Sequence, residues 1–207
     1  MKWPVVLLLS LTSVPLLVSS TVAQGPQMLL DRAVAEFEAG RFTESASLFD
    51  RLADAAPDRA PYLWQRGIAL YYAGRYGDCR RQFESHRSVN LDDVENAAWH
   101  YLCVAREESP AAARAALLPV GPDSRLPMRE IYDMFRGTRT IEQVLAAAGS
   151  QPAAQFYGHL YVGLFLEASG MRERGLERIK VAADDRFQGV GGYMHMVARV
   201  HLRARSQ

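Results

Sequence analysis

The feature that most constrains this chain is an internal period of 34 residues in its N-terminal half. Residues 26–59 align with residues 60–93 without a gap. The copies match at a glycine, at the arginine and aromatic residue that follow it, and at a later phenylalanine: Gly40 with Gly74, Arg41 with Arg75, Phe42 with Tyr76, Phe49 with Phe83. A fixed period of this length indicates stacked copies of one supersecondary unit, each burying its apolar face against the next.

The residue types predict that each unit is a hairpin of two antiparallel helices. Ala33 and Gly67 are small, as the point where two helices cross closely requires. Gly40 and Gly74 are predicted to end the first helix of each unit, because glycine adopts the left-handed conformation without strain. Pro57 is predicted to stop the second helix of the first unit.

A third copy is predicted over about residues 156–187. Gly163 takes the small crossing position, Gly170 the turn and Ile179 the large partner on the second helix. Arg172 stands where an aromatic residue is expected, so we expect a looser end to this hairpin. The three copies resemble tetratricopeptide (TPR) repeats. This resemblance implies an all-α superhelical solenoid over residues 24–207.

Residues 92–150 keep the alternation of helices and turns but lose the consensus, and we interpret them as degenerate hairpins. Asp92 with Glu95 predicts a capping box at one helix start, and Thr140 with Gln143 predicts another. The remaining boundaries are predicted at Ser109, which caps a short helix reaching to Pro119, at Pro127 in the first helical position, and at Gly137 and Gly149 as helix ends.

The C-terminal segment predicts an amphipathic helix over about residues 190–205. Tyr193, Val197 and Val200 share one side, whereas the arginines lie largely on the other. A solenoid needs such a helix to cover its last apolar face. Capping is therefore the favoured interpretation, and contact with anionic lipid is the alternative.

The first 23 residues predict a secretory signal peptide. Lys2 supplies a positive start, residues 5–18 are apolar, and Thr21 with Ala23 offers small residues for cleavage before Gln24. An uncleaved anchor is the alternative, but the apolar run of about 14 residues is shorter than the ~20 a span needs. Gln24 also takes the place of the cysteine that a lipoprotein requires. We therefore expect a soluble periplasmic or extracellular protein.

The net charge narrows the classes of partner that the chain can bind. The formal net charge is +1, and removal of Lys2 with the signal peptide makes it zero. A neutral chain argues against nucleic acid as a partner, because phosphates demand a basic stripe.

The two cysteines, Cys79 and Cys103, fall inside helical patterns. We favour the interpretation that they are two small buried residues. A disulfide between them stays open, because the sequence does not show whether their Cβ atoms match.

Four segments resemble a more specific family, the NlpI family of bacterial envelope TPR adaptors. They are AAWHYLCVAREE, beginning at Ala97, AALLP, beginning at Ala115, PMREIYDMFRG, beginning at Pro127, and FYGHLYVGLFLEASG, beginning at Phe156. The resemblance implies a periplasm-facing adaptor that brings a carboxyl-terminal processing protease to cell-wall endopeptidases, and it allows a homodimer. The chain departs from the family at the missing lipidation cysteine.

We find no pattern that predicts catalysis or a cofactor. The histidines form no HExxH motif and no i, i+4 pair, and the cysteines lie too far apart for a zinc knuckle. No GxSxG elbow or phosphate-binding loop occurs. We interpret Asp92 and Asp93 as favouring a helix N-terminus through its dipole. The expectation is a non-enzymatic protein without metal or cofactor.

The candidate binding site is the concave face that the first helices of TPR hairpins line. The positions expected to point there are Leu30, Val34, Phe37, Trp64, Ile68, Tyr71 and Tyr72. Tryptophan and tyrosine favour interfaces because each buries a large area and keeps a polar group. Such a groove should prefer apolar or aromatic segments to a charged C-terminus. The alternative is that some of these residues are core, or are covered by another part of the chain or by a second copy.

The leading functional hypothesis is an exported scaffold or adaptor that binds proteins or peptides through this face. Two alternatives stay open. In the first, the groove is filled by another copy and the oligomer is the functional object. In the second, the chain is a cell-wall hydrolase with an unfamiliar site, which would need a deep pocket with convergent Asp, Glu or His residues.

Overall fold

The computed structural model describes residues 25–205, and every regular element in that range is a helix. The predicted signal peptide lies outside the described residues. The α-helices are α1 (Pro26–Glu38), α2 (Phe42–Ala55), α3 (Trp64–Tyr72), α4 (Tyr76–His86), α5 (Val94–Glu107), α6 (Pro110–Ala115), α7 (Met128–Arg136), α8 (Ile141–Ala148), α9 (Pro152–Ala168), α10 (Arg172–Ala182) and α11 (Gln188–Arg205). Two short 3-10 helices are η1 (Pro57–Tyr62) and η2 (Asp185–Phe187).

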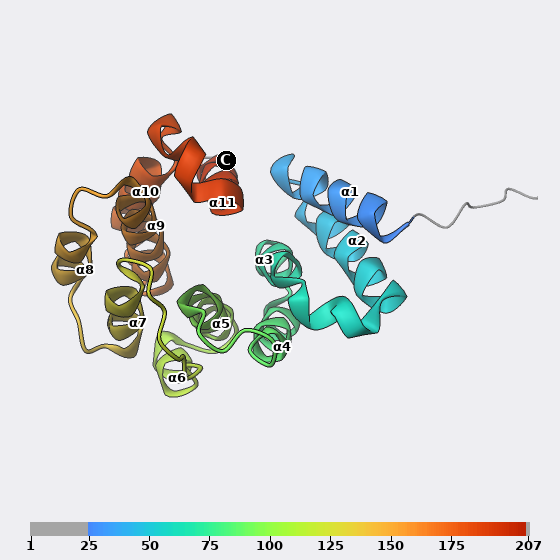
Figure 1. Cartoon of the computed structure of the whole chain (residues 1–207), viewed down its shortest axis with the longest axis horizontal. Coiled ribbons are helices and arrows are strands. Elements are labelled where there is room, and N and C mark those ends of the chain that lie inside the picture. The colour runs from blue at the N-terminus through green and yellow to red at the C-terminus, as the bar shows by residue number, and fades with distance from the viewer. Residues whose placement is uncertain (1–24, 206–207) are drawn as a thin grey trace, which may run out of the picture.

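The helices follow one another round an arc. In Figure 1 the arc runs from α1 and α2 through α3, α4 and α5 to α7–α10, and α11 then returns toward α1. The pairs α1 with α2, α3 with α4 and α9 with α10 are each packed side by side. These pairs are the three hairpins that the repeat pattern predicts.

Glycines at the ends of the first helices reverse the chain in each hairpin. Gly40, Gly74 and Gly170 have φ angles of 79°, 76° and 83°. This left-handed region favours glycine because it has no Cβ to clash. In the first hairpin the N–H of Arg41 donates back to the carbonyl of Glu36 at 2.9 Å. Helix ends predicted from glycine alone are therefore confirmed at all three positions.

Small residues let the two helices of a hairpin approach each other. In the first hairpin, Ser45 Oγ donates to the carbonyl of Ala33 at 2.8 Å. In the third, a Cβ added to Gly163 would lie 2.9 Å from the carbonyl oxygen of Gly175, closer than real Cβ contacts allow. Gly67 takes the same place in the second hairpin, facing the ring of Phe83. The crossing positions are thus confirmed as points of close contact.

The irregular middle agrees with the predicted boundaries only in part. The capping box of Thr140 with Gln143 is present, and Gly137 ends α7 in the left-handed conformation. The predicted cap of α5 is wrong by one residue, because Asp93 and not Asp92 accepts the N–H of Glu95. Pro127 lies at the N-cap of α7, so that helix begins one residue later than predicted.

The helix capped by Ser109 is shorter than its alanine-rich sequence predicts. Ser109 Oγ accepts the N–H of Ala112 at 3.1 Å, which confirms the cap. The helix α6 nevertheless ends at Ala115. The following segment has no regular secondary structure, and the carbonyl of Leu118 accepts a hydrogen bond from Tyr132 Oη on α7. Contact with another helix therefore outweighs local helix propensity.

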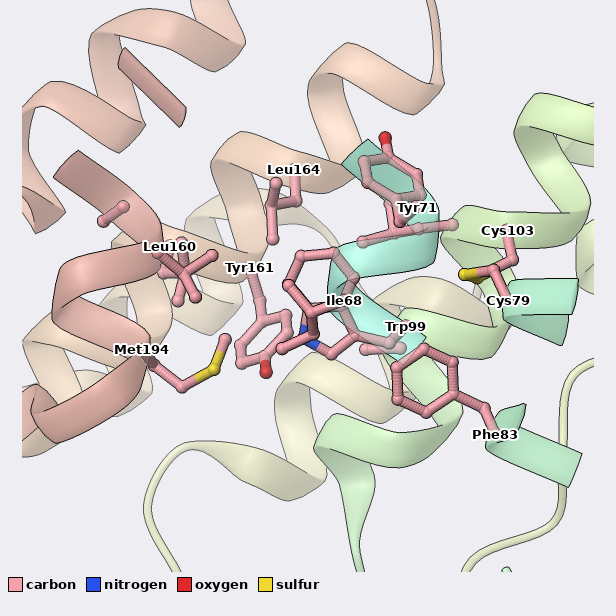
Figure 2. Packing of buried hydrophobic residues seen from close by; sticks show 14 of the residues in the cluster. Ile68, Tyr71, Cys79, Phe83, Trp99, Cys103, Leu160, Tyr161, Leu164 and Met194 are labelled. Carbon is pink, nitrogen blue, oxygen red and sulfur yellow. A yellow bond between two sulfur atoms is a disulfide. The ribbon is translucent and has the colours of Figure 1, made fainter. Parts of the chain in front are cut away.

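A disulfide joins α4 to α5. Cys79 and Cys103 are bonded, with their Cα atoms 5.9 Å apart, and both side chains are fully buried (Figure 2). The favoured interpretation of two unpaired buried cysteines was therefore wrong. The physical reason is that α4 and α5 are packed side by side, which brings the two residues within bonding reach.

The C-terminal helix α11 begins at Gln188 and bends at Gly192, whose φ of 51° and ψ of −130° are not helical. It packs against α9 and α10, as a capping helix should, and Val197 and Val200 are buried. It also contacts α1 at the other end of the arc, where Arg203 Nη2 donates to the carbonyl of Glu38 at 2.6 Å. The arc is therefore closed into a ring by its last helix.

None of the helices within residues 25–205 combines the length and apolar character that crossing a membrane requires. The longest, α11, carries arginines in its last turn. The apolar residues of these helices are instead gathered in one core, whose centre is shown in Figure 2.

Candidate functional site

A cavity of about 490 Å³ lies between α3, α5, α9 and α11. It falls within the ~300–1,000 Å³ range of ligand pockets in proteins. Six aromatic side chains line it: Tyr62, Trp64, Phe83, Trp99, Tyr157 and Tyr193. They come from five parts of the chain, namely the η1–α3 segment, α4, α5, α9 and α11, so only the assembled ring brings them together. This cavity is the candidate functional site.

The aromatic wall is held in place by ring contacts between helices. Trp64, the first residue of α3, meets Tyr193 of α11 edge to face, with ring centroids 5.0 Å apart. Tyr193 also stacks on Phe37 of α1 at 6.2 Å. Across the cavity, Trp99 of α5 stacks on Phe83 of α4 at 6.4 Å. Aromatic pairs in such geometries are worth about 0.5–1.5 kcal/mol beyond the area they bury.

One end of the cavity is acidic. Asp93 and Glu95 both line the cavity. The guanidinium of Arg125, which lies outside the lining, binds both carboxylates, at 2.9 Å from Asp93 and 2.6 Å from Glu95. Asp123 binds the same guanidinium at 2.6 Å. Three carboxylates therefore share one arginine. Asp93 also caps α5, so this acidic end is fixed by the start of a helix as well as by ion pairs.

The environment shifts the acid–base behaviour of these groups. Burial raises the pKa of Glu95, and its hydrogen bond from Tyr161 Oη and the charge of Arg125 only partly oppose this shift. Burial alone would lower the pKa of Arg125, but its hydrogen bonds and charge interactions with Asp123 and Glu95 raise it overall. Burial, with the charge of Glu95, raises the pKa of Tyr157 to about 12. Arg125 therefore stays charged and the tyrosine stays neutral.

Two polar groups in the cavity wall lack a hydrogen-bond partner among the described residues. Trp99 is only 1% exposed and its Nε1 donor is unpaired, as is Tyr193 Oη. In Figure 2 the indole nitrogen of Trp99 faces the side where Tyr161 and Met194 lie, and Met194 is itself part of the cavity wall. Buried donors are normally satisfied, because an unpaired one costs about 1–3 kcal/mol.

The structure separates the seven predicted groove residues. Trp64 lines the cavity. Leu30, Val34 and Tyr72 are half-buried and pack against the core. The other three, Phe37, Ile68 and Tyr71, are buried within the chain itself and have no surface to offer a partner in this conformation.

The physical reason for this burial is the return of α11 and the contact of α3 with α5. Tyr193 covers Phe37, and Tyr72 Oη is hydrogen-bonded to His201 Nδ1 at 2.8 Å. Tyr71 packs edge to face on Trp99 at 5.5 Å. For these positions the alternative interpretation applies, in which core packing or another part of the chain covers the concave face.

Sequence reasoning did not place Trp99, Tyr157, Tyr193, Asp93 and Glu95 in the site. Each has an evident local role: Asp93 caps α5, Trp99 occupies a repeat position and Tyr193 lies on the apolar side of α11. Nothing in their spacing shows that these residues, up to 100 positions apart, meet.

No group of His, Cys, Asp and Glu between residues 25 and 205 is arranged to hold a metal ion. His86 Nε2 does lie 3.9 Å from Asp93 Oδ2 at the cavity, but two such groups are too few for a metal site.

Neither the protein-family models nor the curated proteins include a match to this chain. What the chain does must therefore be argued from its repeats and its cavity.

Proposed function

We propose that this chain is a TPR-type scaffold, exported from the cytoplasm, that holds a segment of a partner protein in its aromatic cavity. The observation that carries the proposal is the cavity of about 490 Å³ with six aromatic walls and unpaired buried donors. Aromatic side chains are enriched where proteins bind other proteins, since they bury large areas at low entropic cost.

The repeat geometry supports the TPR part of the proposal. Residues 34 apart take equivalent structural places: Gly40 and Gly74 both have left-handed turns, and Ala33 and Gly67 both face the second helix of their hairpin. The resemblance to the NlpI family would make envelope proteases and cell-wall endopeptidases the kind of partner to test first.

The buried disulfide supports the export part. Disulfides persist in oxidising compartments such as the periplasm and are rare in the cytosol. Cys79–Cys103 joins two neighbouring helices in the middle of the ring, where it is inaccessible to solvent. A structural disulfide in this place fits a protein that works outside the inner membrane.

The cavity also gathers His86, Asp93 and Glu95, the kind of groups that the hydrolase alternative requires. Their bonding favours a structural use. Asp93 Oδ1 accepts the N–H of Glu95 and binds Arg125. Both carboxylate oxygens of Glu95 are also occupied, one by Arg125 and one by Tyr161 Oη. We therefore propose binding and not hydrolysis.

Site-specific photocrosslinking in the producing cell tests the proposal. A photoreactive amino acid replaces Tyr62, which is 55% exposed and stands in the cavity lining. The matched control places it at Met28, which is 57% exposed and does not line the cavity. We expect a discrete protein adduct from position 62 that is absent from position 28 and is lost when Trp64→Ala is added.

Two results would contradict the proposal: no adduct from position 62, or the same adducts from both positions. An adduct with the mass of two copies of this chain would instead support the self-assembling alternative, and light scattering across concentration would then check it.

A further inference from the structure

We propose that the cavity recognises a basic residue, arginine or lysine, in an extended segment of its partner. This inference rests on the proposed function, and it names the chemistry of the occupant. It changes the expectation from the sequence alone, which pointed to apolar or aromatic segments.

The first argument is charge. Among the described residues that line the cavity, the only acidic or basic side chains with fixed sign are Asp93 and Glu95, and none is a lysine or arginine. Behind them, Arg125 is shared with a third carboxylate, that of Asp123. One guanidinium is thus set against three carboxylates. An occupant that brings a second cation would meet unneutralised acid in a partly desolvated place, where charges interact strongly.

The second argument is the aromatic wall next to this acidic end. Trp64 and Tyr193 meet edge to face, and Tyr62 stands at the exposed side. Indole and phenol faces attract cations within about 6 Å of the ring centroid. The protein already uses this contact at the same place, where the guanidinium carbon of Arg125 lies 5.9 Å from the ring centroid of Tyr157. A cationic side chain satisfies both the ring faces and the carboxylates.

The third argument is independent of charge and concerns the unpaired donors. Trp99 and Tyr193 line the cavity, and their Nε1 and Oη atoms lie just beneath its surface without acceptors among the described residues, so an occupant meets them once these side chains turn toward it. A peptide carbonyl is the acceptor that an extended segment supplies at every residue. A free amine or metal ion offers no such acceptor. The combination of cation and carbonyl therefore indicates a basic residue within a peptide.

Binding of three peptide pools to the full exported chain tests the inference. The pools are degenerate nonapeptides that are identical except for a fixed central arginine, norleucine or glutamate. Affinity is followed by the intrinsic tryptophan fluorescence of the protein. Since a cation–π contact adds an attraction that the norleucine side chain cannot supply, we expect the arginine pool to bind about tenfold more tightly than the norleucine pool. The glutamate pool should bind most weakly.

Matched aspartate variants locate the effect. Asp93→Asn removes a charge but keeps a good helix cap, so we expect the arginine preference to fall about threefold or more. Asp184→Asn is the control, because Asp184 caps η2 in the same way and does not line the cavity. It should leave the preference unchanged. Trp99→Phe, which removes the indole N–H donor together with part of the ring system and keeps an aromatic side chain, should weaken all bound pools together.

The outcomes separate this inference from the proposed function. Equal binding of the norleucine and arginine pools overturns the basic-residue inference but leaves a peptide-binding cavity in place. Tightest binding of the glutamate pool overturns it as well. If no pool binds, the inference fails, and crosslinking at position 62 then decides separately whether the cavity holds a partner.

Discussion

At the scale of single residues, the close packing of α9 on α10 depends on what is missing from Gly163 and Gly175. The backbones of α9 and α10 approach so closely here that a Cβ on either glycine would collide with the backbone of the other helix. The contrast with Gly67 is informative, because a Cβ there would meet only the ring of Phe83. A side chain can move aside, whereas two paired helices cannot.

We therefore predict that Gly163→Ala destabilises the protein by about 1–3 kcal/mol, the usual cost of overpacking. The control is Gly189→Ala, in the first turn of α11, where an added Cβ meets nothing within 4 Å. This control should stay within about 0.5 kcal/mol of the wild type. Urea unfolding followed by circular dichroism measures both. An unchanged midpoint for Gly163→Ala would show that the helices have room to separate.

Helix caps and turns could be predicted from the sequence where neighbouring residues alone determine them. The cap of Thr140 and the turn glycines depend only on neighbouring residues, and they were predicted correctly. The cap of α5 was assigned to Asp92 because Asp92 and Glu95 have the spacing of a capping box. The distinction comes from a loop 30 residues later, since Arg125 binds Asp93 and the N–H of Gly121 donates to the carbonyl of Leu91. Such long-range contacts are invisible to spacing.

At the scale of elements, the hairpins were predictable and the link between hairpins was not. Apolar periodicity and glycine position predict α1 with α2, α3 with α4 and α9 with α10. Whether Cys79 and Cys103 meet depends on how α5 packs on α4, which is a property of two units and not of one. The disulfide fixes this junction.

Removing the disulfide should therefore weaken this junction. The bridge closes a loop of 24 residues, for which the chain-entropy model gives a stabilisation of about 3 kcal/mol. We expect replacement of both cysteines by alanine to lower the free energy of unfolding by about this amount, and reductant to lower the wild-type midpoint in the same direction. The double variant, treated with reductant, is the control and should not respond. If complete reduction left the unfolding midpoint of the wild type unchanged, the disulfide would not stabilise the α4–α5 junction, and the prediction would be contradicted.

At the scale of the whole molecule, the ring is closed by one network on α11. His201 is fully buried, with Nδ1 2.8 Å from Tyr72 Oη on α3 and Nε2 3.1 Å from Glu167 Oε2 on α9. Burial alone would raise the pKa of Glu167, but the hydrogen bond and charge of His201, with the charges of Arg205 and Arg172, lower it overall. The folded chain therefore holds this carboxylate in its ionised form.

This lowered pKa predicts how the closure responds to acid. Because the folded state binds the proton less readily than the unfolded state, Glu167 adds stability above its ordinary pKa of 4.5. That stability is lost as the pH falls through the lowered folded-state value. Glu167→Gln should therefore reduce the melting temperature at pH 7, and its difference from wild type should shrink below about pH 4. Thermal melts across pH measure this, with Glu177→Gln, an exposed site on α10, as the control. A constant difference at all pH values would show that charge is not the cause.

The closure by α11 is also where sequence prediction reached its limit. An amphipathic capping helix was predicted at about the correct residues, and its apolar side was correctly placed inward. Its contact with α1 was not predicted, because a one-dimensional stack of repeats gives its last helix only one neighbour. Because the ring curves back on itself, α1 becomes a second neighbour of α11. In this closed arrangement three of the seven residues that were expected to face a partner are buried.

The construction of the cavity has a consequence for the time course of synthesis. Its walls are contributed by Trp64, Trp99, Tyr157 and Tyr193, which leave the ribosome in that order, and the last of them belongs to the helix that closes the ring. A nascent or truncated chain that ends before α11 can form its early hairpins, yet it has no complete cavity to offer. The ability to hold a ligand there is therefore a property that the protein acquires only after α11 has been translated and has folded.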